Sequence, residues 1–161
     1  KKKAYLIFSF ILLIIFNGCS GYKPIFSSTN LDFVIGNYSI QGNKLLGNKI
    51  YSLLYALSQS NKNNQNKRSI DLLIDSSKHK VALSKNSAGK ILSYKITLNT
   101  KIEVNDYFTN KKILHKTFTS SLTYKIQNQY SETIELEKKT INNLVEKTYQ
   151  DLLISLTQNF L

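Results

Sequence analysis

The residues best suited to chemistry in this sequence are two histidines, His79 and His115, and a single cysteine, Cys19. With Cys19 at the end of the segment described in the next paragraph, the two histidines are too few for a zinc site, which takes three or four such side chains. The sequence contains no GxSxG, GxGxxG or P-loop pattern, and we interpret its 10 acidic residues as solvated side chains. We therefore expect a protein that is not an enzyme, needs no metal or cofactor, and exposes both histidines on strands.

The cysteine stands at the end of a segment built like an export signal. Three lysines at 1–3 precede an apolar run at 4–16, and Asn17 and Gly18 follow before Cys19. The run is shorter than the roughly 20 residues that a membrane-spanning helix requires. This order of parts is typical of a secretory signal peptide. We expect residues 1–18 to be the signal peptide.

The position of Cys19 suggests a use for a thiol that has no internal disulfide partner. Gly18-Cys19 resembles the end of a bacterial lipoprotein signal, in which the cysteine sulfur is diacylated and becomes the new N-terminus. Phe16 replaces the leucine usual three positions earlier. Several acyl chains would hold a protein stably on a membrane. We predict lipidation at Cys19 and a tether over 19–30. The alternative is an ordinary signal or anchor with an incidental cysteine.

The net charge of +12 invites a nucleic-acid interpretation, which the kind of basic residue does not favour. Among the 22 basic residues, only Arg68 is an arginine, and paired hydrogen bonding to bases and phosphates relies mainly on arginine. Removing 1–18 leaves 19 basic and 10 acidic residues, a net charge of +9. We expect no nucleic-acid partner.

Hydropathy patterning predicts one folded domain over 31–161. Alternating apolar residues predict a strand over 31–40 with a bulge at Gly36, and a helical pattern over 44–59 predicts an amphipathic helix. Gly47 within that helix indicates close packing, because glycine costs a helix up to about 1 kcal/mol relative to alanine.

Three further strands and a second helix complete the domain. Strand patterns surround Ile70–Ile74 with a second part at Val81 and Leu83, then Tyr94–Val104 and Phe118–Ile126. Turns are expected at 86–89 and 105–110. A long apolar stripe from Leu136 to Phe160 predicts the C-terminal helix. The fold class is therefore α+β, in the order β-α-β-β-β-α, with two helices packed on one face of a four-stranded, mostly antiparallel sheet.

Lysines gather along the predicted strands. Five of them are candidates for binding the phosphate groups of a glycolipid as point charges: Lys78, Lys80, Lys85, Lys90 and Lys95. The alternative is a solvated sheet face whose charges discourage edge-to-edge aggregation.

Taken together, the chain resembles the lipopolysaccharide-assembly lipoprotein family LptE, in a divergent, alphaproteobacterial-like form. The residues that carry the resemblance are Gly18-Cys19 with the following 21–26, the helix entry at 42–50, and the strand segments 93–96 and 122–124, ahead of the long C-terminal helix. The resemblance covers the chain by element order and is specific by motif only over the first 26 residues.

The resemblance implies the α+β fold and a lipid anchor, through Cys19, on the periplasmic face of the outer membrane. It also implies that the protein plugs an LptD-like β-barrel translocon, assists its assembly, and binds lipopolysaccharide during delivery to the cell surface. Two alternatives stay open. One is an outer-membrane lipoprotein with a structural or transport-accessory role unrelated to a barrel. The other is an exported hydrolase, which activity dependent on His79 or His115 would reveal.

Overall fold

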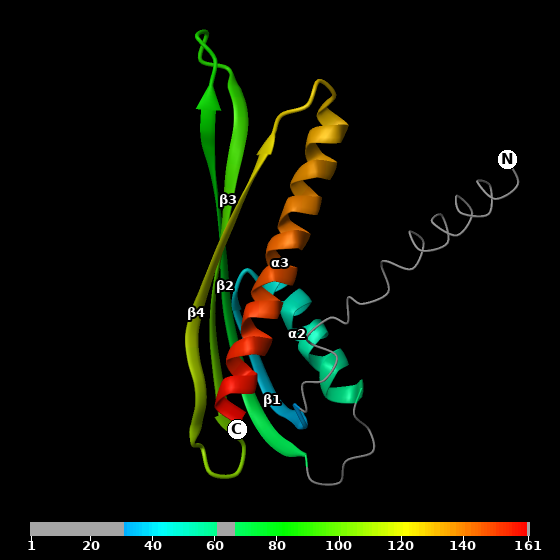
Figure 1. Ribbon diagram of the computed structural model, residues 1–161, viewed down its shortest axis with the longest axis vertical. Coiled ribbons are helices and arrows are strands. Elements are labelled where there is room, and N and C mark those ends of the chain that lie inside the picture. The colour runs from blue at the N-terminus through cyan, green and yellow to red at the C-terminus, as the bar shows by residue number, and fades with distance from the viewer. Residues whose placement is uncertain (1–30, 61–66, 161) are drawn as a thin grey trace, which may run out of the picture. The chain divides into compact units, whose positions relative to one another are not determined.

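The computed structural model describes residues 31–60 and 67–160, and within them two helices cover one face of a four-stranded sheet (Figure 1). In chain order the elements are β1 (Phe33–Gly42), α2 (Lys44–Ser60), β2 (Arg68–Lys85), β3 (Ile91–Asp106), β4 (Lys112–Lys125) and α3 (Tyr130–Phe160). The predicted α+β class and element order are confirmed. The predictions for 1–18, 19–30 and Cys19 fall outside the described residues.

The strands lie in the order β1-β2-β3-β4, with β1 parallel to β2 and the other two pairings antiparallel. Parallel neighbours cannot be joined by a hairpin, so α2 serves as the crossover between β1 and β2. The β1–β2 register shifts between Ile35 and Tyr38, which confirms the bulge expected at Gly36. The sheet is mixed and mostly antiparallel.

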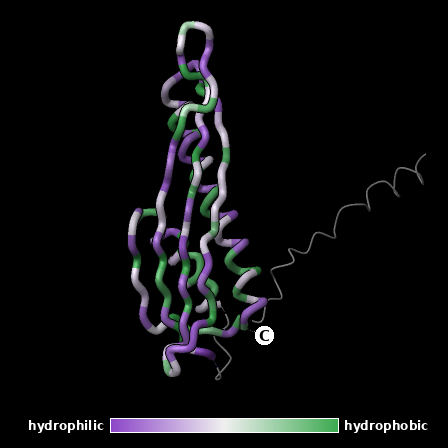
Figure 2. The backbone as a smooth tube through the Cα atoms, turned by 90° about the vertical axis from the view of Figure 1, so that its left-hand side faces the viewer, coloured by the Kyte–Doolittle hydropathy of each residue, from purple (hydrophilic) through white to green (hydrophobic). Residues whose placement is uncertain are grey.

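The core forms where the apolar residues of the strands meet the two helices. Along β3, Ile96, Leu98, Ile102 and Val104 share one face and are buried, because side chains two apart in a strand point the same way. The hydropathy colours in Figure 2 change repeatedly along the strands. Each buried aliphatic side chain contributes about 1.5–3 kcal/mol. The alternation therefore gives the sheet one apolar face, and this face packs against the helices.

Both helices bury a stripe against that face. Ile50 and Leu54 do so from α2, and Leu144, Leu152 and Leu156 from α3, spacings that return to the same side of a helix. The Asn43 side-chain oxygen accepts a hydrogen bond from the Leu46 amide at the start of α2, which satisfies one of the free N–H groups of the first turn.

Gly47 of α2 packs tightly against the edge strand β1. A Cβ at this position would stand 2.5 Å from Cγ2 of Ile40 on β1. Such a separation is well inside van der Waals contact, so the close packing expected from the sequence is confirmed.

The structure differs from the expected boundaries in β2 and β3, and β4 likewise begins at Lys112, before the expected Phe118. The second strand is continuous from Arg68 to Lys85, and its later apolar residues, Val81 and Leu83, are 55% and 54% exposed rather than in the core. β3 also continues through Asp106, so the turn expected at 105–110 is shorter. Cross-strand hydrogen bonding thus extends further than the local sequence suggested.

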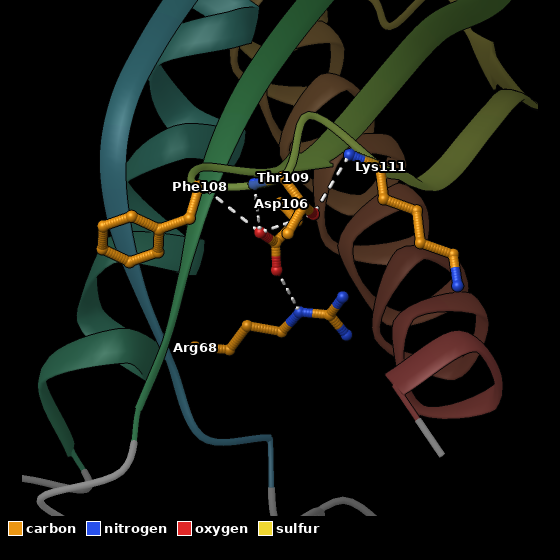
Figure 3. Close-up of polar contacts among 5 residues, drawn as sticks. All are labelled: Arg68, Asp106, Phe108, Thr109 and Lys111. Atoms are coloured by element: carbon orange, nitrogen blue, oxygen red, sulfur yellow. Dashed lines mark hydrogen bonds and ion pairs between the residues drawn. The ribbon is translucent and has the colours of Figure 1, made fainter.

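The one arginine fixes the corner where β2 begins and β3 ends (Figure 3). Arg68 donates from Nε to Oδ2 of Asp106 over 2.8 Å. The other carboxylate oxygen of Asp106 accepts hydrogen bonds from the amides of Phe108 and Thr109 and from the Thr109 hydroxyl. These donors, Arg68 foremost, hold the pKa of Asp106 well below its usual range. The Arg68 guanidinium also lies 5.6 Å from the ring centroid of Phe160, at the end of α3.

Candidate functional site

Two of the five candidate lysines, Lys78 and Lys80, lie on the face of the sheet that the helices cover. They stand opposite Leu98 and Ile96 of β3 in the antiparallel register. Directly opposed residues share a face, and both β3 residues belong to the core. Lys78 and Lys80 therefore continue the core face of β2 beyond Ile74, its last buried apolar residue, although both are exposed.

The other three candidate lysines lie elsewhere. Lys95 stands opposite Val81, so it projects from the opposite face of the sheet. Lys85 and Lys90 flank the turn at 86–89 at the end of the β2–β3 hairpin, at the top of Figure 1. The predicted phosphate-binding set is thus distributed over two faces and a hairpin tip, and the structure does not bring it together into one surface.

Lys80 is engaged within the protein. Its ammonium forms an ion pair with Oε2 of Glu137 on α3 at 2.5 Å, and the Tyr124 hydroxyl donates to the same oxygen over 2.7 Å. The ammonium also lies 4.4 Å from the ring centroid of Tyr94, which stacks on Tyr124. A carboxylate and two aromatic rings from three elements thus surround this lysine.

The contacts shift the pKa values of Lys80, Glu137 and Tyr124. Although burial opposes it, hydrogen bonding to Glu137 and Tyr124 raises the pKa of Lys80. Burial alone would raise the pKa of Glu137. The hydrogen bonds that it accepts from Lys80 and Tyr124 outweigh this effect, and its pKa is lowered. Burial and the neighbouring Glu137 raise the pKa of Tyr124. The charge of Lys80 is therefore compensated by Glu137. An external phosphate should be attracted less strongly to Lys80 than to an unpaired lysine.

Lys78 lies beside a cleft of about 300 Å³ where β2, α2 and α3 meet. Two further lysines, Lys49 on α2 and Lys138 on α3, line the same cleft. Neither of these belongs to the five lysines predicted to bind phosphate. Their spacing in the sequence could have indicated them. Leu45 and Lys49 are four residues apart and share a helix face, and the same holds for Lys138 and Asn142.

The residues that carry general chemical reactivity remain apart. His79 and His115 are exposed on β2 and β4 as predicted, and Nδ1 of His115 lies 3.7 Å from a Glu103 oxygen. Among residues 31–60 and 67–160, no three side chains of the metal-binding types come together. No helix in this part of the chain is both long and apolar enough to span a membrane.

No protein-family model matches the chain, and no curated protein matches it. Three solved structures share its fold at low sequence identity. The rare lipoprotein B from Shewanella oneidensis has a TM-score of 0.52 and 13% identity, over 78% of this chain and 98% of that one. A minor lipoprotein from Acinetobacter baumannii has a TM-score of 0.53 and 15% identity, over 79% and 94%.

The third structure, an uncharacterized lipoprotein B from Nitrosomonas europaea solved in solution, has a TM-score of 0.56 and 12% identity, over 83% of this chain and 88% of the other. At these identities the comparison shows the fold. The chain therefore has the two-helix, four-strand architecture of solved proteins that are named as bacterial lipoproteins.

Proposed function

We propose that this chain is a non-enzymatic outer-membrane lipoprotein that plugs an LptD-like β-barrel translocon, assists its assembly and helps deliver lipopolysaccharide to the cell surface. The lipoprotein part is supported by the signal-like segment ending at Cys19 and by the fold shared with proteins named as lipoproteins. Acyl chains on Cys19 would anchor the domain at the periplasmic face of the outer membrane.

The observation that carries the plug proposal is the polar face of the sheet, opposite the two helices. Four of the β4 residues on this face are exposed hydroxyl side chains, at 117, 119, 121 and 123, and His115 and Lys125 lie on the same face. Thr119 donates to the side-chain oxygen of Asn99 on β3 over 2.8 Å. The lumen of an outer-membrane barrel is polar and lined by hydrogen-bonding side chains. A face on which hydroxyl and amide side chains stand beside charged ones such as Lys95 and Glu103 suits such a wall.

On this proposal the mechanism is steric and electrostatic. The lipid anchor keeps the domain beside the barrel, the polar sheet face contacts the barrel wall, and exposed lysines attract the phosphates of lipopolysaccharide. The lysines available for this are Lys78, Lys85, Lys90 and Lys95, with Lys80 held by its ion pair to Glu137. No step in this mechanism makes or breaks a covalent bond.

The test of the plug proposal is a detergent pull-down of the full-length protein from its native membrane, with identification and quantification of what copurifies. We expect one outer-membrane barrel in stoichiometric amount. The double variant Thr119→Arg/Ser121→Arg, which places two bulky charges on the polar face, should lose the barrel. Gln150→Arg, on an exposed position of α3, is the matched control.

Depletion gives the second arm of this test. Without the protein, the barrel should be misassembled, and correct barrel assembly under depletion would overturn the plug proposal. Lipidation without any stoichiometric barrel partner would instead favour the structural or transport-accessory alternative. Cys19→Ala should leave an uncleaved precursor that takes up no labelled fatty acid, and labelling that persists in this variant would contradict the anchor.

A further inference from the structure

The turn between β3 and β4 exposes an aromatic side chain almost completely. Phe108 is 81% exposed, the largest fraction among the large hydrophobic side chains in the described part of the chain. Its ring meets that of Tyr107 edge-on, with the centroids 5.2 Å apart. Val34 on β1 is exposed beside them, because its strand partner Ser69 accepts a hydrogen bond from the Tyr107 amide. We call Val34, Tyr107 and Phe108 the turn patch. Exposed apolar side chains that gather in this way mark a contact surface.

The turn holds the Phe108 ring in a fixed direction. The backbone amides of Phe108 and Thr109 both donate to the Asp106 carboxylate, which Arg68 also binds. The Asn110 amide donates to the Asp106 carbonyl, and Asn110 closes the turn with a φ of 53°. Figure 3 shows the phenyl ring pointing away from Arg68. A contact made through this ring therefore requires little ordering of the turn when it forms.

The turn lies at the end of the sheet where β1 begins (Figure 1). The Asp32 carbonyl accepts a hydrogen bond from the Arg68 amide over 3.1 Å. The Arg68 side chain in turn binds Asp106, the last residue of β3. β1 and β3 are two strand spacings apart, about 10 Å. The first residues of the folded domain and the turn patch therefore share one end of the molecule.

The position of the lipid anchor in the sequence confines this end. Leu31 follows Cys19 by 12 residues, and a chain of that length spans at most about 40 Å. With acyl chains on Cys19, as proposed above, the end of the sheet that begins at Leu31 stays within that distance of the membrane. The other end is less confined. It contains Tyr130, the first residue of α3, and this helix of 31 residues is about 45 Å long. Its last residue, Phe160, lies beside Phe33.

We propose that the turn patch is a second membrane contact, at which Phe108 inserts into the interfacial layer of the bilayer that holds the Cys19 anchor. Removal of an exposed phenyl ring from water is favourable, and a tyrosine such as Tyr107 suits the level of the lipid headgroups. The acyl chains alone leave the domain free to rotate, whereas a second contact fixes its orientation. The proposal rests on the lipid anchor and does not depend on a barrel partner.

The test uses tryptophan fluorescence, because the chain contains no tryptophan and one substitution therefore gives a single reporter. Phe108→Trp places the reporter in the turn patch. Tyr130→Trp is the matched control at the other end of the domain, since the two native side chains are 81% and 80% exposed. Each full-length variant is reconstituted with phosphatidylcholine vesicles whose acyl chains are either ordinary or brominated, and bromine quenches tryptophan on contact. Circular dichroism checks that each variant is folded.

We expect the emission of Phe108→Trp to move to shorter wavelength in ordinary vesicles. In brominated vesicles it should fall at least about twofold, because tryptophan at the membrane interface reaches the acyl chains. The emission of Tyr130→Trp should fall by less than about one-fifth, since its end of the domain is held away from the bilayer. Added salt should leave the quenching of Phe108→Trp unchanged, because an apolar contact is not screened.

Flotation of the protein with the vesicles reports the anchor separately. A protein that floats with the vesicles while Phe108→Trp is not quenched keeps the anchor and overturns the contact. A protein that does not float overturns the anchor and the contact together. Equal quenching of Phe108→Trp and Tyr130→Trp would show that the domain lies on the membrane with no preferred end, and would overturn the site.

Two further results would assign the turn patch to another use. Short-wavelength emission of Phe108→Trp that bromine does not quench would show that protein, such as a second copy of this chain, covers the patch. Quenching that requires added phosphatidylglycerol and disappears in salt would show attraction by the neighbouring Lys111 and Lys112 rather than insertion of the ring. Either result would overturn the proposal.

Discussion

Lys80 on β2 and Glu137 on α3, 57 residues apart, form an ion pair at 2.5 Å. The Glu137 side chain is 16% exposed and that of Lys80 is 35% exposed, so the pair lies at the margin of the core. It joins the first third of α3 to the part of β2 that lies beyond Ile74, the last buried apolar residue of that strand. The pair therefore attaches the two elements where aliphatic packing ends.

This pair should contribute measurably to stability. In a double-mutant cycle built from Lys80→Gln and Glu137→Gln, we expect a coupling energy of about 0.5–1 kcal/mol. The lower part of the usual range applies because the lysine is more than one-third exposed and solvent screens it. The measurement is urea unfolding of the four proteins at neutral pH. A coupling energy indistinguishable from zero would contradict this view of the pair.

The Arg68–Asp106 contact predicts a dependence of stability on acid pH. Hydrogen bonds from Arg68 and Thr109 lower the pKa of Asp106 from its ordinary value of 3.8 in the folded state. A group whose folded pKa is depressed adds stability that is fully present above the unfolded pKa and is lost as the pH falls through the folded pKa.

The variant Asp106→Asn should therefore unfold at lower urea concentration than wild type at pH 6. The difference between the two proteins should shrink as the pH falls below about 4, because the unfolded wild-type chain then takes up a proton that the folded protein, with its lowered Asp106 pKa, does not. Glu135→Gln is the matched control, an exposed position on α3 that forms no hydrogen bond or ion pair in the described part of the chain. A constant difference between Asp106→Asn and wild type from pH 6 to pH 2 would refute this assignment.

The parts of the fold that are encoded in local patterns could be predicted from the sequence. The residues of β3 that alternate from Ile96 to Val104 face the core as expected, since a strand's two-residue period fixes which side chains share a face. The helix expected over 44–59 forms over Lys44–Ser60. Gly47 indicated close packing because a glycine inside a helix is otherwise costly.

The candidate site could not be predicted in the same way, because its contacts join residues far apart in the chain. Lys49 and Asn142 are 93 residues apart. The residue pattern within a helix does not indicate which face of α3 contacts α2. The five selected lysines were neighbours in sequence, whereas strand alternation sends Lys95 to the opposite face from Lys78. The exposure of Val81 similarly depends on how far the helices cover the sheet.

The core stripe of α3 predicts a sharp contrast between two residues two positions apart. Leu152 is 0% exposed and Ile154 is 44% exposed. We expect Leu152→Ala to lower the free energy of unfolding by about 2–5 kcal/mol, because it removes buried methyl groups and leaves a cavity. Ile154→Ala should lower it by less than about 1 kcal/mol. Thermal and urea unfolding of both variants would check this, and comparable losses would show that the helix is rotated from the described position.

The contact between Gly47 and Ile40 gives a prediction in which two opposing effects compete. Gly47→Ala gains up to about 1 kcal/mol of helix propensity. The new Cβ would meet Cγ2 of Ile40 at 2.5 Å, and a branched side chain cannot easily turn this methyl away. Overpacking of this kind costs about 1–3 kcal/mol. We therefore expect net destabilisation of Gly47→Ala in urea unfolding.

Ile40→Ala separates the two effects, because it removes the methyl group that the new Cβ would meet. Ile40 is half-buried, so the single variant loses some packing energy. In the Ile40→Ala background, however, Gly47→Ala should become neutral or stabilising, since the helix-propensity gain then acts without the clash. The sign change between the two backgrounds is the diagnostic result. If Gly47→Ala is equally destabilising in both, the close approach of α2 to β1 does not explain the glycine, and another contact of α2 must require it.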